Sequence, residues 1–304
     1  MSRPIIVIHG GAGGLTREGL KGDRRVACLT GLRAALAAGC SILSSGGPAL
    51  EAAIAAVCVM EDDPIFNAGR GAVYTAAETQ EMDASLMDGK TRSAGAVAAI
   101  SHVKNPIRAA QAVMTQTQHL LMVGAQAEKV AADSGLQMVS PQHFADARRL
   151  AQLHRAQQDT RILLDHDAET KGTVGAVVVD AAGNVAAATS TGGMTNKLPG
   201  RIGDSAIIGA GTWAWNRTCA VSCTGHGEAI ITANTAARIS ARMELQGMPL
   251  SQAATLAIEE LQQSGAGAGL IAVDSAGNFA LPFNTRGMLR GWQRPGEDPT
   301  AQIW

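Results

Sequence analysis

Apolar residues recur along the chain at two spacings, one typical of helices and one typical of strands. From Gly22 to Ser45 they lie three or four positions apart, which predicts a long helix. A second helix is predicted to start at Pro48, a residue suited to the first helical turn. It should end at Asp62-Asp63-Pro64, because the proline keeps the residue before it out of helical geometry. The mostly apolar run from Pro4 to His9 predicts a buried strand.

Segments with helical spacing and segments with strand-like spacing continue to follow one another towards the C-terminus. A glycine loop is predicted over 67–72, and strands are predicted over 73–75, 82–88, 93–103, 177–179, 185–186, 206–214, 220–224, 271–273 and 279–280. Helices are predicted over 106–122, 125–133, 227–245 and 250–263, and the polar segment 141–158 has helical propensity. This order predicts an α/β (α+β) fold. Two mainly antiparallel sheets would lie face to face with helices outside, as a four-layer α/β/β/α sandwich.

Length and composition support one large domain, residues 1–304, with an aliphatic core. Hydrophobic residues make up 46% of the chain and aromatic residues 3%, so Ala, Val, Ile, Leu and Met must fill the core and global disorder is excluded. The 35 glycines exceed the usual share of roughly 7%. They favour tight turns and close backbone approaches over a coiled coil.

Charge, hydropathy and cysteine spacing exclude several kinds of partner. The net charge is −1 without a basic stripe, so no nucleic-acid partner is expected. The apolar run 5–8 is too short for a signal peptide, and the uncharged run 34–50 is broken by glycines, serines and a proline, so no membrane span is expected. Five widely spaced cysteines predict reduced thiols and a cytoplasmic protein. The close pair Cys219 and Cys223 lacks a histidine pair, which favours buried thiols over a zinc site.

The glycine run from Gly10 to Gly14 has two interpretations. A phosphate-binding loop would need Gly-Lys-Ser/Thr or the Gly-x-Gly-x-x-Gly register, and the run has neither because Thr16 occupies the last position. The favoured interpretation is a loop that needs positive φ or close backbone packing near a site.

A Gly-Thr step just past the middle of the chain is the main candidate for catalysis. The segment from about Asp146 to Lys171 is polar, lacks an aliphatic pattern and is expected to be exposed, as suits a segment that will be cut. It is followed by Gly172-Thr173-Val174-Gly175 and a β-branched run. Thr173 is either an ordinary strand residue or a nucleophile released by cleavage of the bond before it. Gly172 favours the second interpretation, because it permits a strained peptide geometry.

Cleavage before Thr173 would give this hydroxyl its own base. A threonine hydroxyl is a weak nucleophile at neutral pH and needs a proton acceptor. The free α-amine of an N-terminal threonine has a reference pKa of about 7.7–8.0, so it can accept the hydroxyl proton. The sequence contains no recognisable histidine triad motif that would supply another base.

Six motifs in order resemble the plant-type (type III) L-asparaginase/isoaspartyl peptidase family of N-terminal-nucleophile (Ntn) hydrolases. They span nearly the whole chain and are 9–13 (HGGAG), 66–69 (FNAG), 172–177 (GTVGAV), 189–194 (TSTGGM), 199–204 (PGRIGD) and 223–228 (CTGHGE). The resemblance implies the Ntn-type sandwich and self-cleavage into an α subunit, 1–172, and a β subunit, 173–304. The polar linker, about 146–172, would end the α subunit. It also implies a homodimer of αβ units and a small-molecule substrate.

The resemblance also implies a role for each matching residue. Thr173 would be the nucleophile in both self-cleavage and substrate hydrolysis, Thr191 would hydrogen-bond its hydroxyl or amine, and Thr224 with the Gly225 N–H would form the oxyanion hole. The implied substrate-binding residues are Arg201 for the α-carboxylate, Asp204 for the α-ammonium, Asn67 at the site edge, and Gly227. Catalysis would need no cofactor. A structural sodium ion would be held by the backbone carbonyls of Met60, Glu61, Asp63, Phe66, Ala68 and Arg70.

Each of these residues also has a simpler explanation. Arg201 and Asp204 could form a surface ion pair of little energetic value, although a zwitterionic amino-acid head needs one cation beside one anion. Thr224 could be a plain strand end. His226 is interpreted as a packing residue, and Glu228 is explained by the dipole of the following helix.

The leading hypothesis is a self-cleaving threonine amidohydrolase that acts on isoaspartyl (β-aspartyl) dipeptides and L-asparagine through an acyl-enzyme on Thr173. A glycosylasparaginase or threonine endopeptidase of the same superfamily is the alternative among enzymes. A binding protein that never cleaves itself is the alternative among other classes, followed by a nucleotide-binding module built on the Gly10–Gly14 run.

Overall fold

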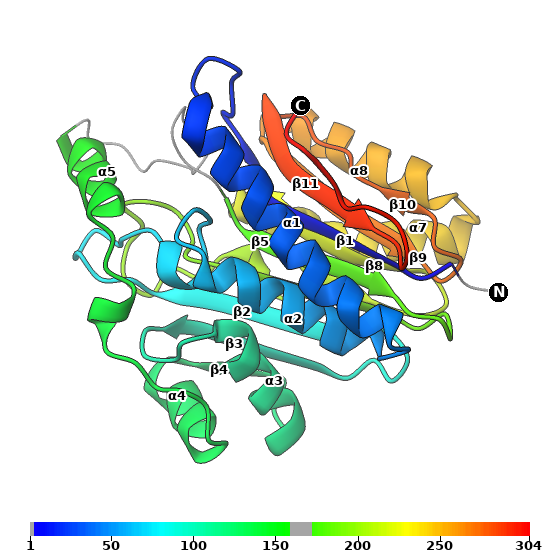
Figure 1. Ribbon diagram of the computed structural model, residues 1–304, viewed down its shortest axis with the longest axis horizontal. Helices are drawn as coiled ribbons and strands as arrows, with labels where there is room; N and C mark the ends of the chain where they lie inside the picture. The colour runs from blue at the N-terminus through cyan, green and yellow to red at the C-terminus, as the bar shows by residue number, and fades with distance from the viewer. Residues whose placement is uncertain (1–2, 159–171) are drawn as a thin grey trace.

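The computed structural model describes residues 3–158 and 172–304 and has four layers (Figure 1). Helices α1 (Gly22–Ser44), α2 (Ala49–Asp62) and α3 (Pro106–Gln116) cover one face of a large sheet, and α7 (Thr235–Gln246) and α8 (Leu250–Gln263) cover the outer face of a small one. The two sheets lie face to face between these helices. The predicted four-layer α/β/β/α sandwich is therefore confirmed.

The large sheet has the order β12-β11-β1-β5-β6-β2-β3-β4. Every neighbouring pair in it is antiparallel except β3–β4. Its strands, in sheet order, are Thr300–Gln302, Gly287–Gln293, Ile5–Gly13, Val174–Val179, Val185–Thr191, Met82–Asp88, Ala94–Ile100 and Leu121–Val123. The N-terminal strand β1 thus pairs directly with β5, the strand that opens just after Thr173.

The small sheet has the order β10-β9-β8-β7 and is antiparallel throughout. Its strands, in that order, are Phe279–Ala280, Ala268–Asp274, Cys219–Gly225 and Thr212–Ala214. The remaining described helices are α4 (Gly124–Asp133), α5 (Ala147–Gln158), α6 (Gly227–Ala233) and the 3-10 turns Gly69–Gly71, Pro141–His143 and Asp204–Ala206.

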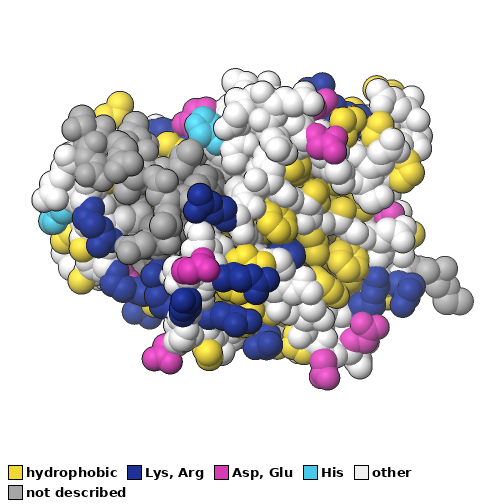
Figure 2. All heavy atoms as spheres, turned by 90° about the horizontal axis from the view of Figure 1, so that it is seen from above, with side chains coloured by type: hydrophobic (Ala, Val, Ile, Leu, Met, Phe, Trp, Pro, Cys, Tyr) yellow, Lys and Arg dark blue, Asp and Glu magenta, His cyan; other side chains and the backbone are white. Residues whose placement is uncertain are grey.

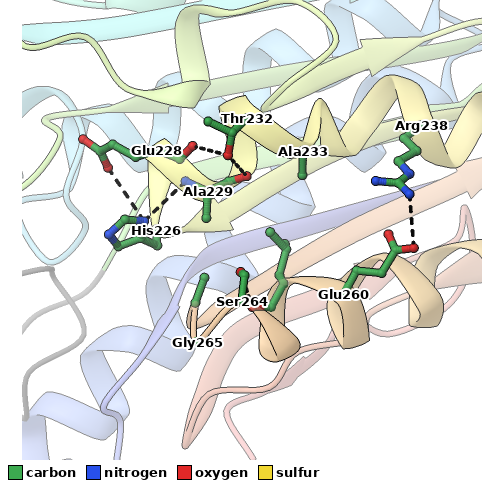
Figure 3. Close-up of a pocket in the computed structure, with 11 residues that line it drawn as sticks. His226, Glu228, Ala229, Thr232, Ala233, Arg238, Glu260, Ser264 and Gly265 are labelled. Carbon is green, nitrogen blue, oxygen red and sulfur yellow. Dashed lines mark hydrogen bonds and ion pairs between the residues drawn. The ribbon is translucent and has the colours of Figure 1, made fainter.

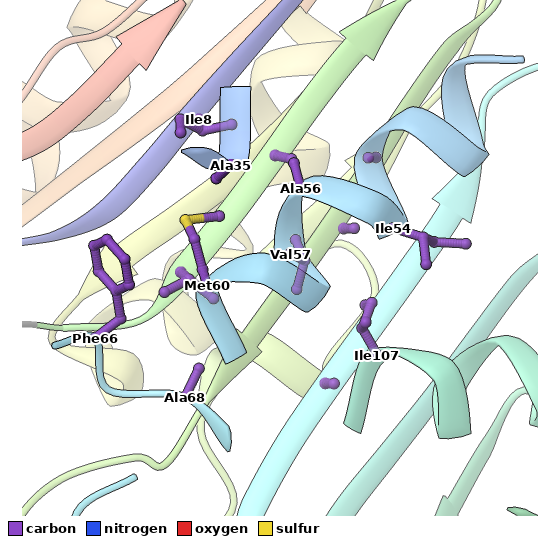
Figure 4. Close-up of a cluster of buried hydrophobic side chains, with 14 of the residues drawn as sticks. Ile8, Ala35, Ile54, Ala56, Val57, Met60, Phe66, Ala68 and Ile107 are labelled. Carbon is purple, nitrogen blue, oxygen red and sulfur yellow. The ribbon is translucent and has the colours of Figure 1, made fainter. Parts of the chain in front are cut away.

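A layer of aliphatic side chains joins the large sheet to its helices, as the composition predicts. Ile8 of β1 lies close to Ala35 of α1 and Ala56 of α2, and Phe66 follows in the next loop (Figure 4). Helix α1 is long and apolar enough to cross a membrane by length and composition alone. Its apolar residues are accounted for by packing, because α1 lies on α2, β1 and β11 with Leu36 fully buried.

Several predicted boundaries were wrong. The helix predicted over 106–122 ends at Gln116, and 121–123 form the edge strand β4. The helix predicted over 227–245 is two helices, because Asn234 adopts a left-handed conformation with φ 50° between α6 and α7. The strand predicted over 206–214 is confined to Thr212–Ala214, and 73–75 form a loop with one bridge from Thr75.

The polar segment before the Gly-Thr step is less exposed than predicted in its first part. Residues 147–158 form α5, in which Leu153 and Ala156 are fully buried and Arg149 and Gln152 are nearly so. Gln152 donates to Thr195 Oγ1, which ties α5 to the loop that follows β6. The remainder of the predicted linker, 159–171, lies outside the described residues.

The surface and the cysteines complete the picture of a densely packed chain. On the face shown in Figure 2, most Lys and Arg side chains gather in one group with few Asp and Glu side chains among them, and hydrophobic side chains are exposed next to this group. All five cysteines are free thiols. Burial raises the pKa of the Cys219 thiol to about 12, and that of Cys223 also rises well above its usual value. The prediction of reduced, largely buried thiols is confirmed.

Candidate functional site

Alternation along the strands brings three threonines into the layer between the sheets. Side chains of a strand point to opposite faces in turn. Val177 of β5 and Ala187 of β6 point into this layer. Thr173 lies four residues before Val177, and Thr191 lies four residues after Ala187, so both threonines point to the same face. Thr224 reaches the layer from β8 of the opposite sheet. All three are buried, with 8%, 2% and 0% of their surfaces exposed.

The hydroxyl of Thr173 is held by a neighbouring threonine. Thr173 Oγ1 donates to Thr191 Oγ1 at 3.0 Å. Thr191 Oγ1 also accepts the backbone N–H of Gly193 at 3.0 Å. The contact between Thr173 and Thr191 that the sequence predicted is therefore present in the fold.

Two glycines let the backbone before Thr173 approach β1 closely. Gly11 has φ +105°, and a Cβ on it would overlap the backbone of Gly172, including its Cα at 2.6 Å. A Cβ on Gly172 would lie 3.0 Å from Thr224 Oγ1, which also accepts the N–H of Ala12 at 3.4 Å. The close packing predicted for the N-terminal glycine run is confirmed, but the prediction of a loop was wrong, because residues 10–13 belong to β1. The run is part of β1 and pairs with β11, so it is not a phosphate-binding loop.

His9 is a functional neighbour that sequence reasoning missed. Its Nδ1 lies 3.0 Å from the carbonyl oxygen of Thr173. The imidazole is completely buried, and burial lowers its pKa to about 3, so the ring is neutral. The signal for this contact was the strand alternation, because His9 shares the inward face of β1 with Val7.

Gly225, the other predicted part of the oxyanion hole, ends β8 in a conformation that favours glycine. Its φ is +145°, and a Cβ there would lie 2.6 Å from both Ala268 Cα and Gly267 O. The glycine therefore allows β8 and β9 to pack closely next to Thr224.

Arg201, Asp204 and Gly227 meet at one place. A Cβ on Gly227 would lie 2.7 Å from Arg201 Nη2 and 3.0 Å from Asp204 Oδ1. Arg201 forms its ion pair with Glu228, donating from Nε and Nη2 at 3.0 Å each, and not with Asp204. The helix-dipole explanation of Glu228 was therefore incomplete. No signal in the sequence linked Arg201 to Glu228, which lies 27 positions further along the chain.

Asp204 is buried with one oxygen unsatisfied. It is 4% exposed, and its Oδ2 has no hydrogen-bond partner in the part of the chain that the structure describes. Burial raises the pKa of this carboxyl to about 7, against an opposing effect of Arg201. The other oxygen, Oδ1, faces Gly227, so it is the atom of this carboxyl that a cationic ligand beside Arg201 would contact.

Asn67 links the site to the loop after α2. Its side-chain amide donates to Gly193 O at 2.8 Å, and its Oδ1 accepts from Val73 N at 3.1 Å. Because Gly193 also donates to Thr191, Asn67 fixes the turn that follows this threonine. Its place at the edge of the predicted site agrees with the sequence expectation.

Comparison with known proteins identifies the family. A family model described as asparaginase matches residues 2–303. The chain belongs to the asparaginase family. It is 46% identical over 311 aligned residues to an isoaspartyl peptidase of Escherichia coli, covering 100% of this chain and 97% of that protein. It is 47% identical over 311 to an isoaspartyl peptidase of Salmonella typhimurium, covering 100% and 99%. An isoaspartyl peptidase/L-asparaginase of Rattus norvegicus is 40% identical over 285 residues, covering 93% and 84%.

In this asparaginase-family chain, the loop predicted to bind sodium, residues 60–70, also contains Asn67. Cβ atoms on Gly69 and Gly71 would overlap the carbonyl oxygens of Glu61 and Phe66, so the loop folds back with its carbonyls close together. The Glu61 side chain is engaged elsewhere, accepting from Ser190 Oγ at 2.6 Å. A set of backbone carbonyls fits a hard cation such as sodium.

An open groove of about 510 Å³ adjoins the Arg201–Glu228 pair in this member of the asparaginase family. His226 and Glu228 lie at one end of it and the Arg238–Glu260 pair at the other, between α6, α7 and α8 (Figure 3). His226 caps α6 by accepting the Ala229 N–H at 3.3 Å, and its side chain is partly exposed, so it acts as a helix cap and not as the packing residue predicted from the sequence.

Proposed function

We propose that this asparaginase-family chain is a threonine amidohydrolase that cleaves itself before Thr173 and then hydrolyses isoaspartyl dipeptides and L-asparagine. The observation that carries the proposal is the buried contact from Thr173 Oγ1 to Thr191 Oγ1, with Gly172 packed against Thr224 on the other side. The names of the relatives, isoaspartyl peptidase and L-asparaginase, support the choice of substrates.

Self-cleavage would use the Thr173 hydroxyl on its own peptide bond. Oγ1 adds to the Gly172 carbonyl carbon, the C–N bond to Thr173 breaks, and the nitrogen takes up the hydroxyl proton as the free amine. Water then hydrolyses the resulting ester, which leaves the Gly172 carboxylate and restores the hydroxyl. Thr224, close to Gly172, would donate to the oxyanion that forms in the first step.

Substrate hydrolysis would repeat this chemistry with the new amine as the base. The Thr173 amine takes the hydroxyl proton, Oγ1 attacks the substrate amide carbon, and the leaving amine or ammonia departs with that proton. Thr224 and the Gly225 N–H would stabilise the oxyanion. Water then hydrolyses the acyl-enzyme.

Arg201 and Asp204 would bind the amino-acid head of the substrate. The guanidinium would bind the α-carboxylate while it keeps its contact with Glu228, and Asp204 Oδ1, which lies beside Gly227, would accept from the α-ammonium. Asn67 would close the edge of the site, and the glycine at 227 leaves room for the head group.

The assembly and the cation are further parts of the proposal. The α subunit would be 1–172 and the β subunit 173–304, with two αβ units forming a homodimer in the cytoplasm. When bound, sodium would hold the loop that carries Asn67 in shape through the carbonyls of Met60, Glu61, Asp63, Phe66, Ala68 and Arg70.

Intact mass measurement of purified protein tests the nucleophile. The wild type should give two chains, the smaller beginning with Thr173, and Thr173→Ala should stay a single chain without activity. Thr173→Ser keeps a hydroxyl and should still cleave. Turnover of β-aspartyl-leucine, asparagine and glycosylasparagine by the matured protein then ranks the substrates. Normal turnover by Thr173→Ala would overturn the proposal.

Arg201→Ala separates binding from self-cleavage. Self-cleavage involves no free α-carboxylate, so its rate should change less than twofold. Loss of a charged hydrogen bond to the substrate, worth about 1.5–3 kcal/mol, should raise KM by roughly 10- to 100-fold. Equal losses in both reactions would contradict the assignment of Arg201.

A further inference from the structure

A chain of buried hydrogen bonds leads from the small sheet to the backbone of Thr173. His9 Nδ1 lies 3.0 Å from Thr173 O, and His9 Nε2 lies 2.9 Å from Ser222 Oγ. Ser222 Oγ lies 2.8 Å from Thr189 Oγ1, which accepts from Thr212 Oγ1 at 2.7 Å. All four side chains are 0% exposed.

Simple proton counting fixes the direction of this chain. A carbonyl oxygen can only accept, so the proton of the neutral imidazole must sit on His9 Nδ1. His9 Nε2 then accepts the Ser222 hydroxyl proton. Since each hydroxyl has one proton to give, Ser222 must accept from Thr189, in agreement with the donation from Thr212. Every link therefore points towards Thr173.

Gly175 provides an independent sign that the fold makes room for this chain. It is the second glycine of Gly-Thr-Val-Gly and pairs with both His9 and Thr189 in the large sheet. A Cβ on Gly175 would overlap Ser222 Oγ and would lie 2.5 Å from His9 Nε2. A side chain of any size at this position would separate the imidazole from the serine.

We propose that His9, held by Ser222, Thr189 and Thr212, is a positioning residue that fixes the orientation of Thr173 through its carbonyl group. The carbonyl, the amine and the Cβ of Thr173 share one Cα, so holding the carbonyl restricts how that residue turns. After cleavage Thr173 has no peptide bond on its amino side, and the hydrogen bond from His9 then remains as a restraint on its carbonyl group. This role rests on the proposed nucleophile but adds a second group of residues that never touch the substrate.

Three substitutions at His9 distinguish positioning from mere filling of space. His9→Asn places an amide N–H near the position of Nδ1 and keeps the link to Thr173 while it loses Ser222. His9→Gln reaches the position of Nε2 and keeps the opposite link. His9→Phe keeps the ring volume and loses both links. Positioning predicts that kcat falls least in Asn, by about tenfold, and by about 100-fold in Gln and Phe, with KM within threefold of wild type.

A structural role predicts the reverse order. If His9 only fills space, Phe should retain kcat and Asn, which leaves a cavity, should be the worst of the three. That order would overturn the proposal. The rates of self-cleavage should follow the same order as kcat. A variant that cleaves itself too slowly to give matured protein is ranked by its self-cleavage rate alone.

A spectroscopic measurement tests the chain without relying on activity. In protein with ¹⁵N-labelled histidine, His9 should show a protonated Nδ1 and an unprotonated Nε2, with the same signals from pH 5 to pH 9. A protonated Nε2 in the neutral ring would overturn the proposal.

Ser222→Ala and a matched control complete the test. Ser222→Ala should lower kcat about tenfold and shift the His9 Nε2 signal, because one hydrogen bond to that atom is lost. Ser240→Ala removes another buried hydroxyl, which lies 2.6 Å from Thr218 Oγ1 and outside the chain of hydrogen bonds, and should leave both readouts unchanged. If Ser222→Ala keeps wild-type kcat while Thr173→Ala is inactive, the positioning role is wrong and the nucleophile stands.

Discussion

The layer between the two sheets has an apolar end and a polar end, built from the same strands. At the apolar end, Val7, Val177 and Ala187 lie side by side in one row across β1, β5 and β6. Two residues further along each strand, the corresponding row is His9, Gly175 and Thr189. The next inward positions are Thr173, just before β5, and Thr191, at the end of β6.

The comparison shows how one scaffold serves both stability and chemistry. The apolar row gains free energy from burial alone and needs no specific partner. The polar row is equally buried, so each of its groups must be hydrogen-bonded, and the bonds made by His9 and Thr189 meet that need. The apolar end anchors the strands, and their polar ends can then be held in place by a few directional contacts.

Gly175→Ala should give the largest effect, because it brings a side chain into the polar row. The new Cβ would overlap Ser222 Oγ, so the strand or the serine must shift. Losing two buried hydrogen bonds at once should slow self-cleavage by about 100-fold or more. Time courses of cleavage by intact mass measure this.

Ala186→Gly is a suitable control for Gly175→Ala. Ala186 pairs with Val178 in the same sheet but packs on the helix side of it, so its change alters strand flexibility without entering the polar row. Self-cleavage should stay within a few-fold of wild type. Equal slowing in both variants would mean that the strand as a whole, and not the space around His9, governs the reaction.

Asp204, in the proposed substrate-binding loop, should carry part of the pH dependence, since burial raises the pKa of its carboxyl to about 7. Below that pH the group is protonated and cannot bind an ammonium. Because the Thr173 amine must also be unprotonated to act as the base, we expect kcat/KM to fall by up to about 100-fold per pH unit below 7, and Asp204→Asn to reduce that slope to about tenfold per unit while lowering activity throughout. A pH profile of matured protein measures it.

Stability should respond to Asp204 in the opposite sense. The folded state binds the carboxyl proton more tightly than the unfolded state, so between about pH 4 and pH 7 it holds more protons. The free energy of unfolding should therefore fall as the pH rises through this window, and the fall should be smaller in Asp204→Asn. An identical pH dependence of stability in both proteins would contradict a buried, ionising carboxyl.

The sequence predicted the layers and made Thr173 a candidate nucleophile, but it did not predict the contacts that join distant segments. Hydrophobic spacing sufficed for α1 and α2, because apolar residues recur along the whole length of both helices. It failed at Asn234, where a left-handed residue breaks a continuous helical pattern, and in α5, whose buried Arg149 looks like a surface residue in the sequence.

The contacts of the site depend on strand register and on loop packing, which no local pattern encodes. His9 reaches Thr173 across 164 residues of sequence, and Ser222 reaches His9 across 213. Arg201 was predicted to lie beside Asp204, and it does, yet its ion pair is with Glu228. Residue type indicated the chemistry of each group, and the fold was needed to assign its partner.

A pair of single substitutions, one in each row, gives the smallest and most direct test of the comparison. Val177→Ala removes two buried methyl groups from the apolar row and should lower the free energy of unfolding by about 2 kcal/mol, with kcat within twofold of wild type. Thr189→Val keeps the side-chain shape but removes a hydroxyl from the polar row. It should cost about 1 kcal/mol of stability and lower kcat about fivefold, because Ser222 loses its donor and His9 is held less firmly. Urea unfolding and steady-state kinetics on the two matured proteins measure both quantities. If Val177→Ala lowered kcat as much as Thr189→Val does, the two ends would not differ in function, and general packing of the layer would explain the activity without any role for the hydrogen-bond chain.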